Sequence, residues 1–368
     1  MGYQVTQIDV DEAGRIYRSC KDRKFITAKA DISGICVKIH SEDRSVVDMW
    51  RDNFYPMLDC VRTHARIFCL NDESGELKVL YNRMTSTAFL YNFDYYGWIK
   101  SIALAMASDI LEDSHKIYSV HGAALDIDGT GVTLIAPSKT GKTTQSWGLL
   151  RMENAHLITD DWYFVRLTKG RPLSSGSEKN CYIDADIGDV WEEFKPLVET
   201  TKFDNKGRGI ANVRWVTGKD SVTDCTYMRY VIFLRRDHND EEISRELSID
   251  EAMDYIVKND FCNPHQMIRD ERKIVLRTEF FREFLSCCRV FLVNTRTKAE
   301  DTQETIRKKM YASYPSFTHS ISPFTCFRPL SVGASGNNAM PSFSRVTPLT
   351  SRKHFFFPSA KKSKRESP

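Results

Sequence analysis

The residues best suited to chemistry form a short loop at 136–144, with the sequence APSKTGKTT. A loop that ends in Gly-Lys-Thr between a strand and a helix binds phosphates through backbone N–H groups and the helix N-terminus. Its lysine reaches the β- and γ-phosphates, and the next hydroxyl binds Mg²⁺. The pattern is a Walker A motif, or P-loop, and it predicts nucleotide binding by Ser138, Lys139, Thr140, Gly141, Lys142, Thr143 and Thr144.

The flanking segments favour the context that this motif requires. Residues 131–136, GVTLIA, are apolar and β-branched, which predicts a buried strand. Apolar residues then recur at helical spacing over 144–150, so we expect a helix to start near Lys142. The motif departs from its pattern at Ala136, in place of the first glycine, and at Lys139, where many such loops have glycine.

Two acidic residues, Asp160 and Asp161, directly follow the apolar run AHLIT at 155–159. Carboxylates at a strand end near a phosphate loop can hold Mg²⁺ and orient an attacking hydroxyl. A strand predicted over 118–128 begins beside the loop and carries His121. These residues point to phosphate chemistry.

The motifs resemble, in this order and spacing, the catalytic domain of bacterial HPr kinase/phosphorylase: HGAAL at 121–125, GTG at 129–131, the loop at 136–143 and TDD at 159–161. The loop ending is also similar to that of phosphoenolpyruvate carboxykinases, which share this fold. The resemblance covers about residues 114–310 and is strongest over 118–166. It implies an α/β fold in which a mixed sheet carries a P-loop.

The resemblance also implies roles for individual residues. Lys142 would hold the phosphates of ATP or ADP, and Thr143 with Asp160 would hold Mg²⁺. One of Asp160 and Asp161 would be the catalytic base, supported by His121, and we predict that it is Asp161. The chain would then be a kinase that transfers phosphate from ATP or another donor to a hydroxyl, on a protein serine or a small molecule.

Two arginines are candidates for binding phosphate or substrate, because a guanidinium can contact two oxygens at once. They are Arg208 and Arg214, in and beside a segment that weakly echoes the Arg- and Gly-rich HPr kinase signature. Surface charge is the alternative interpretation of both.

Two alternatives to a kinase remain open. A carboxykinase would need a metal site built from Lys and His and a site for a three-carbon acid, and the sequence identifies neither. A regulatory protein that binds nucleotide without turnover is favoured by two departures. These are Lys139 and Thr144, the latter at a position where the kinases often carry an acidic residue.

With 368 residues, of which 41% are hydrophobic, the chain can form two domains. We predict an N-terminal α+β lobe over 1–113, the nucleotide-binding domain over 114–310, and a disordered basic tail over 311–368. The tail holds twelve serines and seven of the twelve prolines, so it cannot form a periodic core.

The predicted elements come from hydrophobic periodicity and capping signals. The strands are 35–40, 65–70, 77–81, 87–91, 228–235 and 289–295, and the helices are 46–55, 252–258, 280–287, 300–310 and one that follows Asp94. In this last helix Ile99, Ile102 and Met106 share one face. The YYGW sequence at 95–98 is interpreted as a buried helix entry rather than a ligand platform.

The net charge of +3 is unevenly distributed, since the tail carries +7 and leaves −4 for residues 1–310. A mildly acidic body argues against nucleic-acid binding. The ten cysteines form no C-x-x-C pair, which is typical of a reduced, cytoplasmic protein. No run of 18 apolar residues indicates a membrane span, and a homo-oligomer remains possible.

Overall fold

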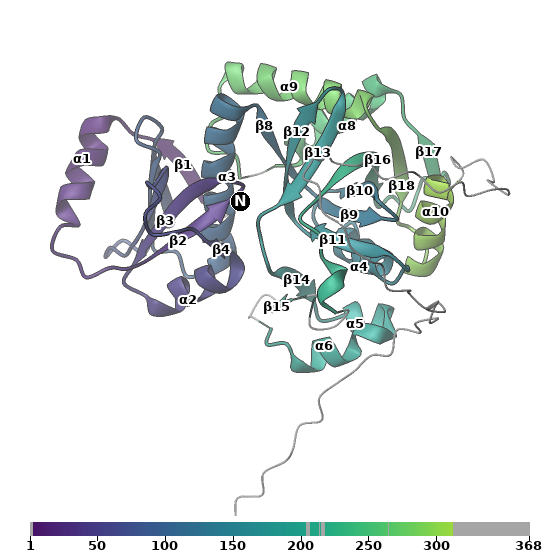
Figure 1. The fold of residues 1–368 in the computed structure, drawn as a ribbon, viewed down its shortest axis with the longest axis horizontal. Helices are drawn as coiled ribbons and strands as arrows, with labels where there is room; N and C mark the ends of the chain where they lie inside the picture. Colours follow the sequence, from purple (N-terminus) through teal and green to yellow (C-terminus); the bar gives the residue numbers. More distant parts are fainter. Residues whose placement is uncertain (1–2, 204–206, 213, 215–217, 264, 312–368) are drawn as a thin grey trace, which may run out of the picture. The chain divides into compact units, whose positions relative to one another are not determined.

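The computed structural model describes residues 3–203, 207–212, 214, 218–263 and 265–311. Apart from Tyr311, the predicted tail lies outside these residues. The chain up to Tyr311 forms one compact unit of mixed α/β structure (Figure 1), and its division near residue 113 remains a prediction. In the described part of the chain, no helix combines the length and apolar character needed to cross a membrane.

The first sheet contains seven strands in the order β1-β6-β7-β5-β3-β2-β4. Their bounds are β1 Gln4–Gln7, β2 Ile26–Ile32, β3 Ile35–Ser41, β4 Tyr55–Pro56, β5 Ala65–Leu70, β6 Lys78–Asn82 and β7 Thr87–Tyr91. The helices of this region are α1 (Val10–Ser19) and α2 (Arg44–Asn53). The four strands and the helix predicted here are confirmed to within two residues at each end, whereas β1, α1, β2 and β4 were not foreseen.

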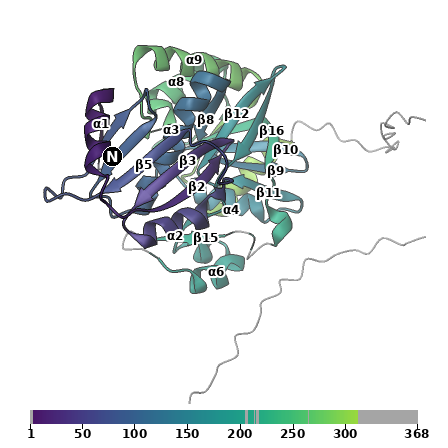
Figure 2. The ribbon, with the colours of Figure 1, turned by 60° about the vertical axis from the view of Figure 1, so that its left-hand side comes forward.

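Helix α3 (Tyr96–His115) lies between the two large sheets. Figure 2 shows it beside β3 and β5 on one side and near β8 and β12 on the other, and one hydrophobic core joins Ile67, Ile102 and Trp162. The helix entry predicted at residues 95–98 is present, with Tyr96 and Gly97 buried and Tyr95 and Trp98 half-buried. Because α3 is covered on nearly all sides, its charged residues Lys100, Asp109 and Glu112 are buried and need partners.

The second sheet follows the path β11-β9-β10-β16-β13-β12-β8, with β18 pairing both β16 and β17. Its strands are β8 Ile117–His121, β9 Ala123–Ile127, β10 Thr130–Ile135, β11 Ala155–Thr159, β12 Trp162–Thr168, β13 Arg171–Gly176, β16 Cys225–Arg235, β17 Ser244–Glu246 and β18 Arg289–Asn294. Strands β10, β16 and β18 are parallel neighbours, while β9 pairs antiparallel with β10. The sheet is therefore mixed, as predicted.

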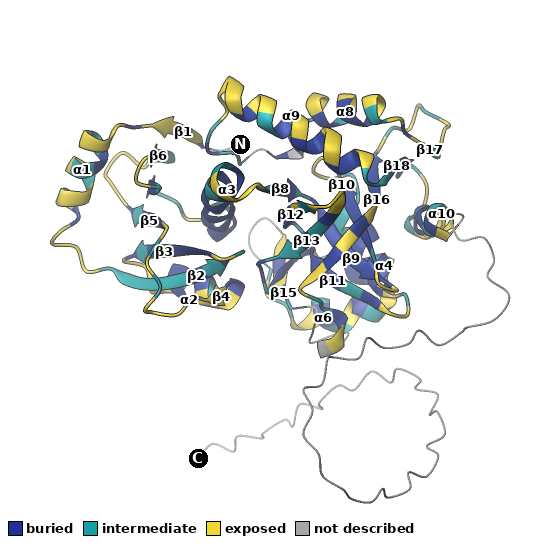
Figure 3. Ribbon diagram, turned by 45° about the horizontal axis from the view of Figure 1, so that its top comes forward, coloured by how far each residue is buried: buried dark blue, intermediate teal, exposed yellow. Residues whose placement is uncertain are grey.

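Helices cover both faces of this sheet. One core contains residues of α4 (Lys142–Leu150), α5 (Ile187–Val190), α6 (Lys195–Thr200) and α10 (Ala299–Tyr311). The other contains residues of α8 (Ile249–Lys258) and α9 (Glu271–Ser286). Figure 3 shows that α8 and α9 bury one side and expose the other. The predicted helix 280–287 is the last part of the longer α9, whose start is capped by Asp270.

The single strand predicted over 118–128 is wrong. The chain instead forms β8, which pairs with β12, and β9, which pairs with β10 and β11. It bends at Gly122, whose N–H donates to the Asp161 carbonyl at 2.9 Å. A Cβ at this position would lie 2.8 Å from the Leu134 carbonyl oxygen, so the close approach requires glycine. The bend places His121 at the end of its strand.

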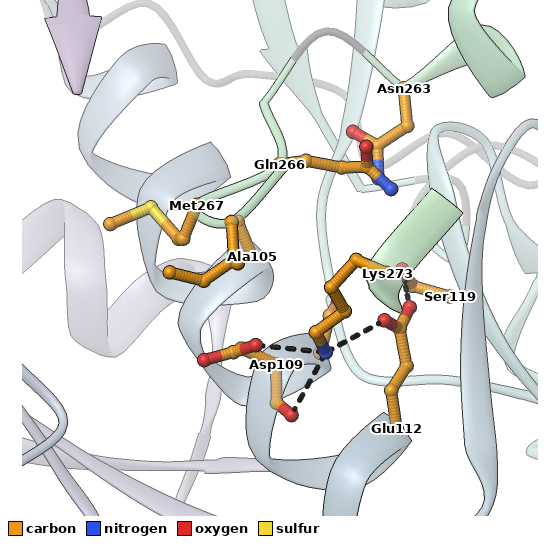
Figure 4. Close-up of a pocket in the computed structure, with 10 residues that line it drawn as sticks. Ala105, Asp109, Glu112, Ser119, Asn263, Gln266, Met267 and Lys273 are labelled. Atoms are coloured by element: carbon orange, nitrogen blue, oxygen red, sulfur yellow. Dashed lines mark hydrogen bonds and ion pairs between the residues drawn. The ribbon is translucent and has the colours of Figure 1, made fainter. Parts of the chain in front are cut away.

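The far end of α3 is tied to α9 by buried ion pairs, which we call the α3–α9 ion network. Lys273 Nζ lies 2.8 Å from Asp109 Oδ1 and 3.2 Å from Glu112 Oε2, as Figure 4 shows. It also lies 3.0 Å from Asp113, and Arg277 pairs with Glu112. A cavity of about 10 Å³ beside these groups has room for about one water molecule. The network therefore links α3 to α9 through paired, mostly buried charges.

Candidate active site

The loop after β10 adopts the turn that a phosphate-binding motif needs. Gly141 precedes α4 with φ 92°, a left-handed conformation that glycine adopts without steric cost. Lys139 is also left-handed, with φ 67°. This explains why glycine is common at that position, and the lysine costs about 1 kcal/mol there. The substitution therefore strains the loop without preventing its turn.

Neighbouring elements hold the loop. The Thr295 hydroxyl donates to the Thr140 carbonyl at 2.9 Å, and the Thr140 hydroxyl donates to the Pro137 carbonyl at 2.7 Å. The Trp191 indole N–H donates to the Thr144 carbonyl at 2.8 Å. Of the other predicted nucleotide-binding residues, Ser138 and Lys139 are exposed, and Lys142 and Thr143 are partly exposed.

Three basic side chains converge on the Asp161 carboxylate. Lys142 Nζ and His121 Nε2 lie 2.8 and 2.9 Å from Oδ1, and Lys100 Nζ lies 3.1 Å from Oδ2. Burial raises the pKa of Asp161, but the three basic groups outweigh it and hold the pKa well below its usual range. The side chain is still 28% exposed, so this ionised carboxylate can be reached from solvent.

Sequence reasoning missed Lys100, which α3 supplies. Its ammonium lies 2.9 Å from Glu178 Oε1 and 4.5 Å from the centroid of the Tyr182 ring. Asn53 donates to the same glutamate oxygen at 3.1 Å. Burial lowers the pKa of Lys100, but Glu178 and Asp161 outweigh it and keep the lysine charged. A lysine within an otherwise apolar stretch, next to Ile99, was the available signal.

The two adjacent carboxylates have different environments. Asp160 is buried, and its Oδ2 accepts the Tyr182 backbone N–H at 2.7 Å. Its Oδ1 has no hydrogen-bond partner among the described residues. Burial, followed by the adjacent charge of Asp161, raises the pKa of Asp160. The pKa of Asp160 is therefore raised, whereas that of Asp161 is lowered.

The two candidate arginines lie apart. Arg208 begins β15 (Arg208–Ala211), opposite Asp184 in β14 (Cys181–Asp184). Arg214 instead donates to the Tyr55 hydroxyl in β4 at 3.0 Å. Partial burial lowers the pKa of Arg208, but Tyr95, Asp184 and, last, Asp161 outweigh it and raise the pKa.

Comparison with known proteins points to one class of enzyme. The chain is 26% identical over 135 residues to a phosphoenolpyruvate carboxykinase (ATP) of Aeropyrum pernix. The match covers 34% of this chain and 27% of that enzyme. No protein-family model matches the chain. The chain thus has a distant similarity to an ATP-dependent carboxykinase, and the closer resemblance to HPr kinases stays a prediction.

Proposed function

We propose that the chain is a nucleotide-dependent phosphotransferase resembling HPr kinase, built on the P-loop fold that those kinases share with carboxykinases. It would transfer the γ-phosphoryl group of ATP to a hydroxyl. The observation that carries this proposal is the convergence of Lys142, from the loop, and His121, from β8, on Asp161. It supports a site in which a phosphate-binding cation and a reactive carboxylate act together.

The proposed roles follow from charge and position. Lys142 and the loop amides would bind the β- and γ-phosphates, which is positioning and charge neutralisation rather than covalent catalysis. As Lys142 engages phosphate, Asp161 loses one of its cationic neighbours, and its pKa rises toward a value suited to a base. Asp161 would then accept the proton of the acceptor hydroxyl, while His121 orients the carboxylate.

The side chains near the loop offer the oxygen donors that Mg²⁺ prefers. Thr143 presents a partly exposed hydroxyl in the first turn of α4, and Asp160 has a carboxylate oxygen without a hydrogen-bond partner in the described chain. These two residues would hold the ion. Bound Mg²⁺ would supply neutralisation of the phosphate charge.

A carboxykinase-like activity is the second candidate. It requires a metal site that includes Lys and His, and Lys100 and His121 both contact Asp161. The similarity to the Aeropyrum carboxykinase also favours it, although the match covers only 27% of that enzyme. A protein that binds nucleotide without turnover is the non-catalytic alternative.

Calorimetric titration with Mg-ATP tests the site. Lys142→Ala should weaken binding tenfold or more, about 1.4 kcal/mol, because it removes the cation nearest to Asp161 in the loop. Lys139→Ala is the matched control, since that lysine is exposed in the same loop and should change affinity less. Unchanged affinity in a folded Lys142→Ala protein would contradict the site, and transfer of γ-labelled phosphate separates an enzyme from a binder.

A further inference from the structure

A cavity of about 360 Å³ lies between the start of α3 and the two-stranded sheet of β14 and β15. Its walls include four aromatic side chains and two cationic ones, which are Tyr95, Tyr96, Tyr182, Phe203, Lys202 and Arg208. Its volume falls in the range of small-molecule sites, which combine apolar walls with a few polar groups. In contrast, the cavity beside the α3–α9 ion network has about 10 Å³.

The cavity shares a wall with the candidate active site. Tyr182 lines the cavity, its backbone N–H binds Asp160, and its ring lies beneath the Lys100 ammonium. Lys100 in turn contacts Asp161 at 3.1 Å. Tyr182 and Lys100 therefore connect the cavity wall to the proposed base, Asp161.

The aromatic wall is fixed by a glycine in the first turn of α3. A Cβ at Gly97 would lie 2.5–2.6 Å from ring atoms of Tyr95, so only glycine leaves room for the ring in this position. The same ring meets Trp98 edge to face, with centroids 5.6 Å apart. The residues at the start of α3 therefore also form a wall of the cavity.

The charge of the lining favours an anion. Among the described residues of the wall, two are cationic, Arg208 and Lys202, and one is acidic, Asp94. A guanidinium can pair with two oxygens of a carboxylate or phosphate, and tyrosine rings can cover a short carbon skeleton.

We propose that this cavity binds the phosphate acceptor, and that the acceptor is a small hydroxylated anion rather than a protein segment. The inference rests on the proposed function. The acceptor oxygen forms a bond to the γ-phosphorus of ATP while the β–γ bridging P–O bond breaks. Asp161 takes the hydroxyl proton, and ADP leaves with the bonding electrons.

The test uses the full-length protein loaded with Mg²⁺ and a non-hydrolysable ATP analogue. Calorimetry measures binding of D-glycerate as a carboxylate, glycerol 3-phosphate as a phosphate ester, and glycerol as the uncharged control. At least one anion should bind, and glycerol should not. The two arms distinguish a carboxylate from a phosphate ester. If none of the anions binds, the assignment of the cavity is wrong.

Variants locate the binding. Arg208→Gln should lower the affinity for the anion at least tenfold and leave the affinity for ATP within twofold. The reason is that Arg208 lines the cavity and is not part of the loop. Arg171→Gln is the matched control and should change neither, since that arginine lies over the Tyr227 ring, 4.0 Å from its centroid. Gly97→Ala should displace the Tyr95 ring and thereby also lower the affinity for the anion.

Two results would overturn the inference while leaving the phosphotransferase intact. One is anion binding that is unchanged in Arg208→Gln, with ATP binding still dependent on Lys142. The other is efficient phosphorylation of a protein serine at a rate independent of Arg208. Loss of ATP binding in the parent protein would instead be a failure of the proposed function itself.

Discussion

Helix α3 carries two buried groups of charged side chains, one at each end, and they differ in their surroundings. At its start, Lys100 pairs with Asp161 and Glu178 beside a cavity of about 360 Å³. At its far end, Glu112 pairs with Lys273 and Arg277, and the adjacent cavity has about 10 Å³. In the first group Asp161 is 28% exposed, whereas Lys273 and Glu112 are each 4% exposed.

The difference is the one expected between a charge cluster that stabilises the fold and one that serves the proposed site. Burying charges is costly, and the cost is offset only when every charge has a partner. In the α3–α9 ion network Lys273, Arg277 and Glu112 are at most 4% exposed, and the more exposed Asp113 pairs with Lys273 and Arg272. In the site cluster three basic groups meet one accessible carboxylate, while the neighbouring Asp160 has a raised pKa. Unequal environments of adjacent titratable groups are typical of functional sites.

The largest effect should come from breaking the α3–α9 ion network. Lys273→Met leaves Asp109 and Glu112 buried without their lysine, which should lower the free energy of unfolding by about 3–5 kcal/mol. Arg272→Met, on the same helix but half-exposed, should cost less than about 1 kcal/mol. Urea unfolding measures both. Equal costs would show that the network contributes no more than a surface pair.

Removing the exposed carboxylate should instead affect chemistry. Asp161→Asn keeps the shape but removes the charge, so phosphoryl transfer should fall by about 10² or more, the scale of a general base. Nucleotide affinity should stay within a few-fold. Single-turnover transfer and equilibrium binding are measured side by side, with the exposed Asp186→Asn as the control. Undiminished transfer in Asp161→Asn would refute its role as the base.

The α3–α9 ion network should also lose stability in acid. Burial raises the pKa of Asp113, but hydrogen bonds from Arg272 and Lys273 outweigh it and lower the pKa to about 2. Because this lies below the unfolded value of about 3.9, the stabilisation is complete above that pH and is lost as the pH falls toward 2.

Between about pH 5 and pH 2.5, the parent protein should therefore lose over about 1 kcal/mol more than Asp113→Asn. Urea midpoints across this range provide the measurement. Parallel pH curves for the two proteins would argue against the assignment.

The smallest predicted effect is a gain in stability rather than a loss, and it concerns Asp160 in the candidate active site. Because the pKa of Asp160 is raised, its ionisation disfavours the folded state increasingly as the pH rises above about 4. Asp160→Asn removes this charge and can still accept the Tyr182 N–H. It should gain about 1 kcal/mol or more at pH 8, equivalent to one pKa unit, and weaken the Mg²⁺ dependence of transfer. Lower stability at pH 8 would contradict the contrast between the clusters.

The sequence alone determined the features that depend on neighbouring residues. Strand β10, the loop and the start of α4 follow from a β-branched run, a Gly-Lys-Thr triplet and helical spacing. The capping box at Ser248 and Glu251 also signals α8, which begins at Ile249, three residues before the predicted helix 252–258. Each signal lies within a few residues, so local conformational preferences were sufficient.

Local reasoning failed where distant segments meet. The bend at Gly122 was missed because it reflects contact with the Leu134 carbonyl, 12 residues away. Lys100 was missed because a lone lysine in an apolar helix acquires meaning only from its partners, 61 and 78 residues along the chain. Periodicity shows that such a residue is buried but cannot name the carboxylates that neutralise it. Tertiary structure decided these pairings, because burial of a charge is satisfied in space rather than along the sequence.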